Sequence, residues 1–250
     1  MTAETGRNDL VAREAEDLLQ ELVARTRYVL FDFDGPICRL FAHLPAETIA
    51  RAQVQWLESH GGDGVLTEEE RFNPDPHGVL ITLAERYPGT DLVAELEEWL
   101  TQQELKAARV AMPTAYADPL IQTWVAVGAR LAIVSNNSAR TVASYLQQRG
   151  LFSCFDHIYG RTQDLSVLKP HPQTLNLALR AMGAAPDVSL MIGDSPSDHA
   201  AALRAGVRFL GYARSDAAVP KLLAAGVPEH CIMVGSMKRL LDAVRRVRPC

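Results

Sequence analysis

Residues 28–38 of the chain read YVLFDFDGPIC, and this stretch decides the prediction of the fold. It begins as a run of aromatic and branched aliphatic residues, which is typical of a buried strand. The run ends in Asp32 and Asp34, which are followed by Gly35 and Pro36. Side chains two residues apart on a strand start on the same side, about 6.5 Å apart, and two such carboxylates repel unless a cation or a proton lies between them. The pair therefore indicates either chemistry or a strand end with a turn, for which Asp-Gly-Pro is also common.

Five further apolar runs of β type follow along the chain, and helical patterns alternate with them. These runs are RLAIVSN, FDHIY, VSLMIGD, VRFLGY and CIMV. Strands that alternate with helices predict a parallel sheet with helices on both faces. We therefore expect an α/β fold whose core is a doubly wound, Rossmann-like parallel sheet formed by residues 27–40 and 114–250.

The segment between the first and second strands has no strand signal. It contains the helical patterns LPAETIARAQVQWLESH and TDLVAELEEWLTQQELKAARV, separated by GGDG, NPDPHG and YPG. A crossover between parallel strands needs only about a dozen residues. We therefore expect residues 41–113 to form an inserted, all-helical cap domain. Residues 1–26 are predicted to form an N-terminal helix extension, which either packs on the sheet domain or forms an oligomer contact.

Composition limits the class of protein. The 250 residues are 48% hydrophobic and 22% charged, with a formal net charge of −5, which fits one core and a small second lobe and argues against a nucleic-acid or membrane-surface partner. No apolar run approaches the ~20 residues that span a bilayer. The cysteines, Cys38, Cys154, Cys231 and Cys250, lie far apart, and the N-terminus lacks an apolar signal-peptide core. We expect a cytoplasmic monomer or homodimer that acts on small molecules.

Three further motifs carry polar residues at strand ends or at helix starts. Ser135 and Asn136 end the run IVSNN, Lys169 lies in SVLKPHP, and Asp194 and Asp198 lie in MIGDSPSDHAAALRAG. Each has an ordinary alternative, because Ser, Asn and Asp often cap helices and a lone lysine is usually solvated. The carboxyl ends of parallel strands meet at one edge of the sheet. We therefore expect these side chains to gather there with the two aspartates of the first strand.

In these motifs the chain resembles the haloacid dehalogenase-like hydrolase superfamily, specifically its phosphatase branch. The family motifs occur in order as Asp32-Phe33-Asp34-Gly35, Ser135, Lys169, and Gly193-Asp194 with Asp198 and a downstream Ala-Gly. The helical insertion matches the position of the cap in the class whose cap lies between the first and second motifs, as in phosphoglycolate phosphatase-like members.

The resemblance implies a phosphatase mechanism. Asp32 would attack phosphorus and form an aspartyl-phosphate, while Asp34 would act as general acid and then base. Lys169 would offset the charge of Asp32 and bind the phosphoryl oxygens. The phosphate would be bound by Ser135, Asn136, Gly35 and Lys169. Mg²⁺ would be bound by Asp32, by the backbone carbonyl of Asp34 and by Asp194, and Asp198 would lie behind these metal ligands. The substrate would be a small phosphorylated metabolite.

Two alternatives stay open at this point. A phosphosugar mutase would use the same aspartyl-phosphate, and a catalytically degenerate member would only bind. Pro36 stands where most relatives have Thr, and it lacks both an N–H and a hydroxyl, which keeps the degenerate member open. A phosphorylation-receiver domain is disfavoured, because it would be about half as long and would lack the insertion.

Substrate choice should depend on the cap, although for each candidate below a surface or packing role is the simpler interpretation. The candidates are His43, Arg51, Gln55, Trp56 and Arg86 in the cap, with Tyr159 and Arg161 before the lysine loop. The histidines His157, His171 and His199 show no metal-ligand spacing and are expected to be structural.

Overall fold

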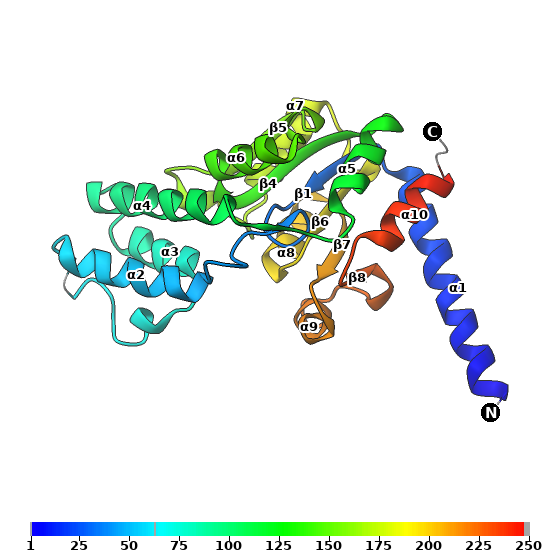
Figure 1. Cartoon of the computed structure of the whole chain (residues 1–250), viewed down its shortest axis with the longest axis horizontal. Coiled ribbons are helices and arrows are strands. Elements are labelled where there is room, and N and C mark those ends of the chain that lie inside the picture. Colours follow the sequence, from blue (N-terminus) through cyan, green and yellow to red (C-terminus); the bar gives the residue numbers. More distant parts are fainter. Residues whose placement is uncertain (1, 63, 248–250) are drawn as a thin grey trace.

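The computed structural model describes residues 2–62 and 64–247, and its main feature is a parallel sheet (Figure 1). The strand order is β5-β4-β1-β6-β7-β8, and every neighbouring pair is parallel. The strands are β1 (Tyr28–Phe31), β4 (Arg130–Ser138), β5 (His157–Arg161), β6 (Ser189–Gly193), β7 (Arg208–Ala213) and β8 (Ile232–Val234). The predicted α/β fold with a doubly wound parallel sheet is confirmed.

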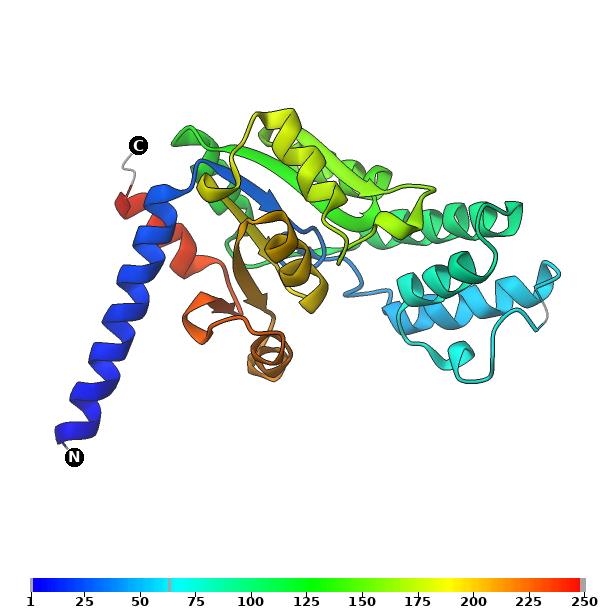
Figure 2. The same ribbon diagram turned by 180° about the vertical axis from the view of Figure 1, so that it is seen from behind.

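Helices cover both faces of the sheet (Figures 1 and 2). Side chains alternate along β1, so that Val29 and Phe31 enter one apolar cluster and Leu30 enters the other. The first cluster contains residues of α5 (Ala117–Ala126), α6 (Ala139–Arg149) and α10 (Lys238–Val247). The second contains residues of α7 (Gln173–Met182) and α8 (Pro196–Ala205). Burial on both faces explains why these strands are apolar throughout.

The N-terminal helix α1 (Thr2–Arg25) packs along α10 and points away from the cap (Figure 1). Leu19 and Val23 anchor it in the first apolar cluster. None of the helices in the described part of the chain has the length and apolar character needed to cross a membrane. Cys38, Cys154 and Cys231 carry free thiols, while Cys250 lies outside the described residues.

The cap consists of α2 (Ala46–Ser59), α3 (Pro76–Arg86) and α4 (Asp91–Ala108). These helices bury an apolar cluster that Leu165 and Leu168 of the sheet domain join. Helix α3 begins inside NPDPHG, where the sequence indicated a turn. Its start is nevertheless well specified, because the Asp75 side chain accepts the N–H of His77 and Pro76 occupies the first turn. Asp and Pro are common in both turns and helix starts, and this ambiguity concealed the helix.

Helix α4 belongs to both lobes. Leu96 and Leu100 pack in the cap cluster, whereas Ala107 and Ala108 pack in the cluster of the sheet domain. Two short strands, β2 (Cys38–Arg39) and β3 (Met112–Pro113), pair antiparallel where the chain leaves and re-enters the sheet domain. Each strand has two residues, which is too short for any sequence pattern to reveal it. Helix α9 (Val219–Ala224) follows β7.

Candidate active site

The carboxyl ends of β1, β4 and β6 border a pocket of about 490 Å³ between the sheet and the cap. Asp32 and Asp34 follow β1, Ser135 and Asn136 lie in the last part of β4, and Asp194 follows β6. Lys169 reaches the same pocket from the loop before α7. The structure thus brings the sequence-predicted residues together, with the exception of Gly35, which does not border this pocket.

Lys169 is the buried cation of the site, with 4% of its surface exposed. Its Nζ donates to Asp32 Oδ1 at 2.7 Å and to the Val134 carbonyl at 2.9 Å, and it lies 2.6 Å from Asp198 Oδ1. Burial alone would lower the pKa of Lys169, but Asp198 and Asp32 outweigh burial and raise that pKa above its usual value. Lys169 is therefore charged in the folded protein.

Asp198 is fixed by the start of α8. Its Oδ2 accepts the Ser195 hydroxyl at 2.7 Å and the N–H groups of Ser195 and Asp194 at 3.0 and 3.1 Å. Ser195 Oγ accepts the N–H of Asp198 in return, which completes a capping box. A Cβ on Gly193 would lie 2.5 Å from that of Asp198, so glycine is required there. The ordinary role as helix cap and the contact with Lys169 are thus combined in one carboxylate.

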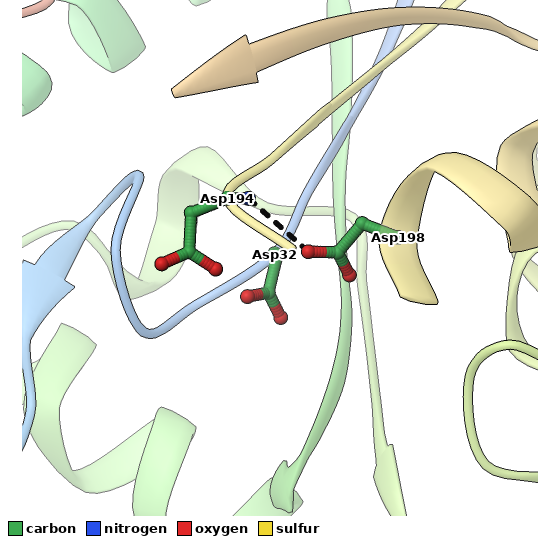
Figure 3. A group of neighbouring side chains, drawn as sticks. All are labelled: Asp32, Asp194 and Asp198. Atoms are coloured by element: carbon green, nitrogen blue, oxygen red, sulfur yellow. Dashed lines mark hydrogen bonds between the residues drawn. The ribbon is translucent and has the colours of Figure 1, made fainter. Parts of the chain in front are cut away.

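Three carboxylates form a cluster that could hold a metal ion (Figure 3). Ligand oxygens of Asp32, Asp194 and Asp198 lie within 4.8 Å of one another. Burial raises the pKa of Asp194 well above its usual value, and Asp32 and Asp198 raise it further. Burial also raises the pKa of Asp32, whereas Lys169 opposes that rise. A bound cation would relieve this repulsion, and a set of oxygen donors suits Mg²⁺, so the residues present fit such an ion.

Asp34 lies in the turn that follows β1. Its Oδ1 accepts the N–H of Leu40 at 2.8 Å. Burial raises the pKa of Asp34 to about 6 against the effect of this hydrogen bond, and the charge of Asp32 raises it as well. Such a carboxyl can carry a proton near neutral pH.

The turn explains both Gly35 and Pro36. Gly35 has φ +107°, and a Cβ on it would lie 2.6 Å from Asp194 Cγ. The N–H of Gly35 donates to the Cys38 carbonyl at 2.6 Å, so it is not available to a phosphate. Gly35 borders an adjoining pocket instead, and its role toward phosphate stays a prediction. The backbone hydrogen bonds of the turn come from Gly35, Ile37 and Cys38, and none of them needs an N–H at Pro36.

Asn136 makes a contact that the sequence did not reveal. Its side-chain amide donates to the Lys169 carbonyl at 3.0 Å and accepts the Lys169 N–H at 2.9 Å, so it holds the lysine loop in addition to bordering the pocket. Ser135 is fully buried, and its hydroxyl donates to the Asn137 side chain at 3.2 Å. Both residues thus position the site.

The cap contributes different residues from those expected. The cap residues near α3 that border the pocket are Pro74, Asp75, His77 and Ile81. Arg51 instead pairs with Glu47 on α2, and Arg86 pairs with Glu70 at 2.7 Å. Trp56 stacks on His60. His43, Gln55 and Tyr159 are likewise absent from the pocket lining in the described part of the chain.

A buried polar network connects His77 to the sheet domain through Glu104 of α4. Glu104 Oε1 lies 2.9 Å from His77 Nε2, accepts Arg161 Nη1 at 2.8 Å, and accepts the Asn137 amide at 3.1 Å. Burial alone would raise the pKa of Glu104, but Arg161 and His77 outweigh burial and hold that pKa well below its usual range. Arg161 is therefore buried in this network and does not border the pocket.

The fold and the site together define a hydrolase with a carboxylate-rich centre at the end of a parallel sheet. The model of the haloacid dehalogenase-like hydrolases matches residues 26–206. The chain belongs to this family.

Individual relatives agree with the family. The chain is 32% identical over 196 residues to phosphoglycolate phosphatase 1 of Pseudomonas aeruginosa, covering 73% of this chain and 67% of that protein. It is 33% identical over 145 residues to pyrophosphatase PpaX of Bacillus cereus, covering 58% of this chain and about half (52%) of that protein. The haloacid dehalogenase-like family protein SP0104 of Streptococcus pneumoniae shares the fold, with a TM-score of 0.60, 16% identity and coverage of 87% and 98%.

Proposed function

We propose that the protein is a Mg²⁺-dependent phosphatase that hydrolyses a small phosphate monoester through an aspartyl-phosphate on Asp32. The observation that carries this proposal is the contact of one buried lysine, Lys169, with both Asp32 and Asp198. Phosphate monoesters hydrolyse extremely slowly without a catalyst, so an enzyme must supply a nucleophile and must offset charge. The site supplies both within one pocket.

In the first step the Asp32 carboxylate would attack phosphorus, and the bond from phosphorus to the leaving oxygen would break. Lys169 would offset the negative charge that the carboxylate and the phosphoryl oxygens bring together. The Asn136 side chain binds both the backbone N–H and the backbone carbonyl of Lys169, which holds the lysine loop in place before substrate binds. Such preorganisation costs no rearrangement during the reaction.

Asp34 would give its proton to the leaving oxygen and then take a proton from the water that hydrolyses the aspartyl-phosphate. Its pKa of about 6 supports this role, because a carboxyl with the usual pKa near 4 is almost fully ionised at neutral pH.

Asp32 and Asp194 would hold Mg²⁺, together with the backbone carbonyl of Asp34. When bound, the ion would screen the charge of the carboxylate from that of the phosphate group. Asp198 would act behind these ligands, because its oxygens already bind Lys169 and the start of α8.

The substrate is proposed to be a small phosphorylated metabolite, and the enzyme a cytoplasmic monomer or homodimer with neither nucleic acid nor membrane as a partner. The names of the relatives, phosphoglycolate phosphatase and pyrophosphatase, support a small phosphorylated substrate. Asp75 and His77 of the cap border the same pocket and can contact the phosphorylated substrate.

The test is release of inorganic phosphate from p-nitrophenyl phosphate and from a panel of phosphorylated metabolites, with Mg²⁺ and with a chelator. Asp32→Asn should reduce turnover at least about 10³-fold, as removal of a nucleophile does in other enzymes. The control is Asp216→Asn, an exposed residue outside the pocket, which should retain activity. A folded wild type that releases no phosphate would overturn the proposal in favour of a binding module, and isomerised sugar phosphate without free phosphate would identify a mutase.

A further inference from the structure

A second pocket, of about 210 Å³, shares Asp34 and Asp194 with the active-site pocket and is not lined by the cap residues near α3. Its walls come from the segment around β2, from the end of β7 and from the region of α9. A single water needs roughly 10–15 Å³ by the same measure of volume, so the pocket can take a substantial chemical group. It borders the same two carboxylates as the active site, and the two pockets therefore adjoin.

Three cationic side chains line this second pocket: Arg39, Arg214 and Lys221. Their nitrogens form no ion pair with any carboxylate among the residues that the structure describes. Other arginines near the cap and the core, such as Arg161 and Arg86, are paired. An exposed cation alone means little, because solvent and salt screen it. The three cations outnumber the two carboxylates, Asp34 and Asp194, that line the same pocket, so a surplus of positive side chains remains for an anion to join.

Arg39 is the most informative of the three. It is half-buried on β2, and its Nε is buried without a hydrogen-bond partner in the described part of the chain. Buried polar atoms in folded proteins are nearly always satisfied, so such an atom marks a missing partner. The positive charges of Arg39 and Arg214 both act on Tyr212 in the same wall, although burial dominates and raises the pKa of that phenol. Arg39 and Arg214 thus line the same pocket as Tyr212.

We propose that the second pocket binds a second oxyanion group of the substrate, a carboxylate or a phosphate, while the transferring phosphoryl group lies at Asp32. This inference rests on the proposed phosphatase function. Asp34 borders both pockets and would protonate the leaving oxygen, so a short leaving group can extend from the active site past Asp34 toward Arg39. The planar guanidinium forks of Arg39 and Arg214 match carboxylate and phosphate groups. The subsite belongs to the sheet domain and to β2, not to the helical cap.

The consequence is a preference among phosphate esters. Substrates whose leaving group carries an acid, such as 2-phosphoglycolate or inorganic pyrophosphate, should be favoured over ethyl phosphate, which has an uncharged leaving group. Loss of one charge-assisted hydrogen bond corresponds to about tenfold or more in affinity. We therefore expect wild type to show a kcat/KM at least about tenfold higher for 2-phosphoglycolate than for ethyl phosphate.

The test compares wild type with Arg39→Met, Lys221→Met and the double variant. The variants should lose about tenfold or more in kcat/KM for 2-phosphoglycolate and stay within about twofold of wild type for ethyl phosphate. Arg51→Met, which removes a cation outside both pockets, is the matched control and should change neither. If Arg39→Met does not fold, Lys221→Met and Arg214→Met test the same pocket from exposed positions.

A binding measurement separates this inference from the proposed function. Calorimetric titration with phosphonoacetate and with ethylphosphonate needs no turnover, and wild type should bind phosphonoacetate at least about tenfold more tightly, a preference that the double variant loses. Equal affinities would overturn the inference even if phosphatase activity is found. Binding of inorganic sulfate that depends on Arg39, with no preference for phosphonoacetate, would also overturn it, because the pocket would then serve a free anion. Failure of turnover with this preference intact would overturn only the proposed function.

Discussion

The Glu104 carboxylate on the cap helix α4 lies 2.8 Å from the guanidinium of Arg161 on the core strand β5, and neither side chain is exposed to solvent. Arg161 also binds Glu97 at 2.9 Å, about two turns before Glu104 on the same helix. Removing one partner of a buried ion pair leaves the other charge without compensation. The join between cap and core therefore depends on a polar contact, in addition to apolar packing.

We expect Glu104→Gln to lower the free energy of unfolding by about 3 kcal/mol. Glu98→Gln on the same helix is the matched control, because Glu98 pairs with Arg140 at the surface, where such pairs contribute about 1 kcal/mol or less. Denaturant unfolding of both variants measures the difference. Equal losses would show that the buried pair stabilises the fold no more than the exposed one does.

The same residue should affect stability in acid. The folded-state pKa of Glu104 lies below its ordinary value, so its contribution is fully present above the unfolded-state pKa, near about 4.3, and is lost as pH falls through the folded-state pKa. Wild type should therefore lose more stability than Glu104→Gln between about pH 5 and about pH 3. Parallel curves of unfolding free energy against pH would contradict this assignment.

Asp198→Asn should impair Lys169, although it keeps the size and shape of the side chain at position 198. The NH₂ group of an amide at this position must face either the Lys169 ammonium or the N–H groups of Asp194 and Ser195. In both orientations one hydrogen-bond donor faces another donor. We expect turnover to fall by about 10²-fold, because a small misplacement of a catalytic group has that effect. Steady-state assays with p-nitrophenyl phosphate measure turnover, and an unchanged value would show that activity does not depend on the contact of Asp198 with Lys169.

Gly35→Ala should reduce activity more than stability. The new methyl group would collide with Asp194 at 2.6 Å, which displaces a proposed metal ligand, in addition to the strain of φ +107°. Gly89→Ala supplies the control, because Gly89 also has positive φ, at +72°, but has no atom within 4 Å of the added carbon. Both variants should lose about 1 kcal/mol of stability, and only Gly35→Ala should require more Mg²⁺ for half-maximal activity. An unchanged Mg²⁺ titration would argue against the role of Asp194.

His77→Gln tests whether the cap contacts the substrate. His77 borders the pocket and is held by Glu104 at 2.9 Å. If it donates to a phosphoryl oxygen of the substrate, its loss should raise KM by about tenfold and change kcat less. His60→Gln, on the outer surface of the cap, is the control. An equal KM in the two variants would limit His77 to a structural role.

The strands and the edge of the sheet where the site lies were predictable from sequence for a simple reason. Each long strand is an uninterrupted apolar run, because both faces of the sheet are covered, and polar residues directly after such runs must gather at one edge. Asp32 and Asp194 follow from this rule alone, whereas Lys169 lies in the loop before α7 and was expected from the order of the motifs and the family resemblance.

The rule could not reveal contacts that depend on how the cap sits on the core. His77 meets Glu104 across 27 residues, and Arg161 meets it across 57, separations for which the local pattern carries no signal. Arg51 was one of the cap candidates for substrate choice, yet Glu47 lies one helical turn before it and pairs with it. The side-chain hydrogen bonds of Asn136 to the lysine loop were equally invisible in sequence.

The position of β1 in the middle of the sheet has a consequence for protein synthesis. Tyr28–Phe31 pair with residues 130–133 on one side and with residues 189–192 on the other. A chain still emerging from the ribosome already contains Asp32 and the whole cap, but it lacks the strand that precedes Asp194 and the helix that supplies Asp198. Distant pairings of this kind also form slowly. The nascent protein should therefore stay catalytically silent until residue 198 has left the exit tunnel, and a prematurely terminated product would keep the cap without an active site beneath it.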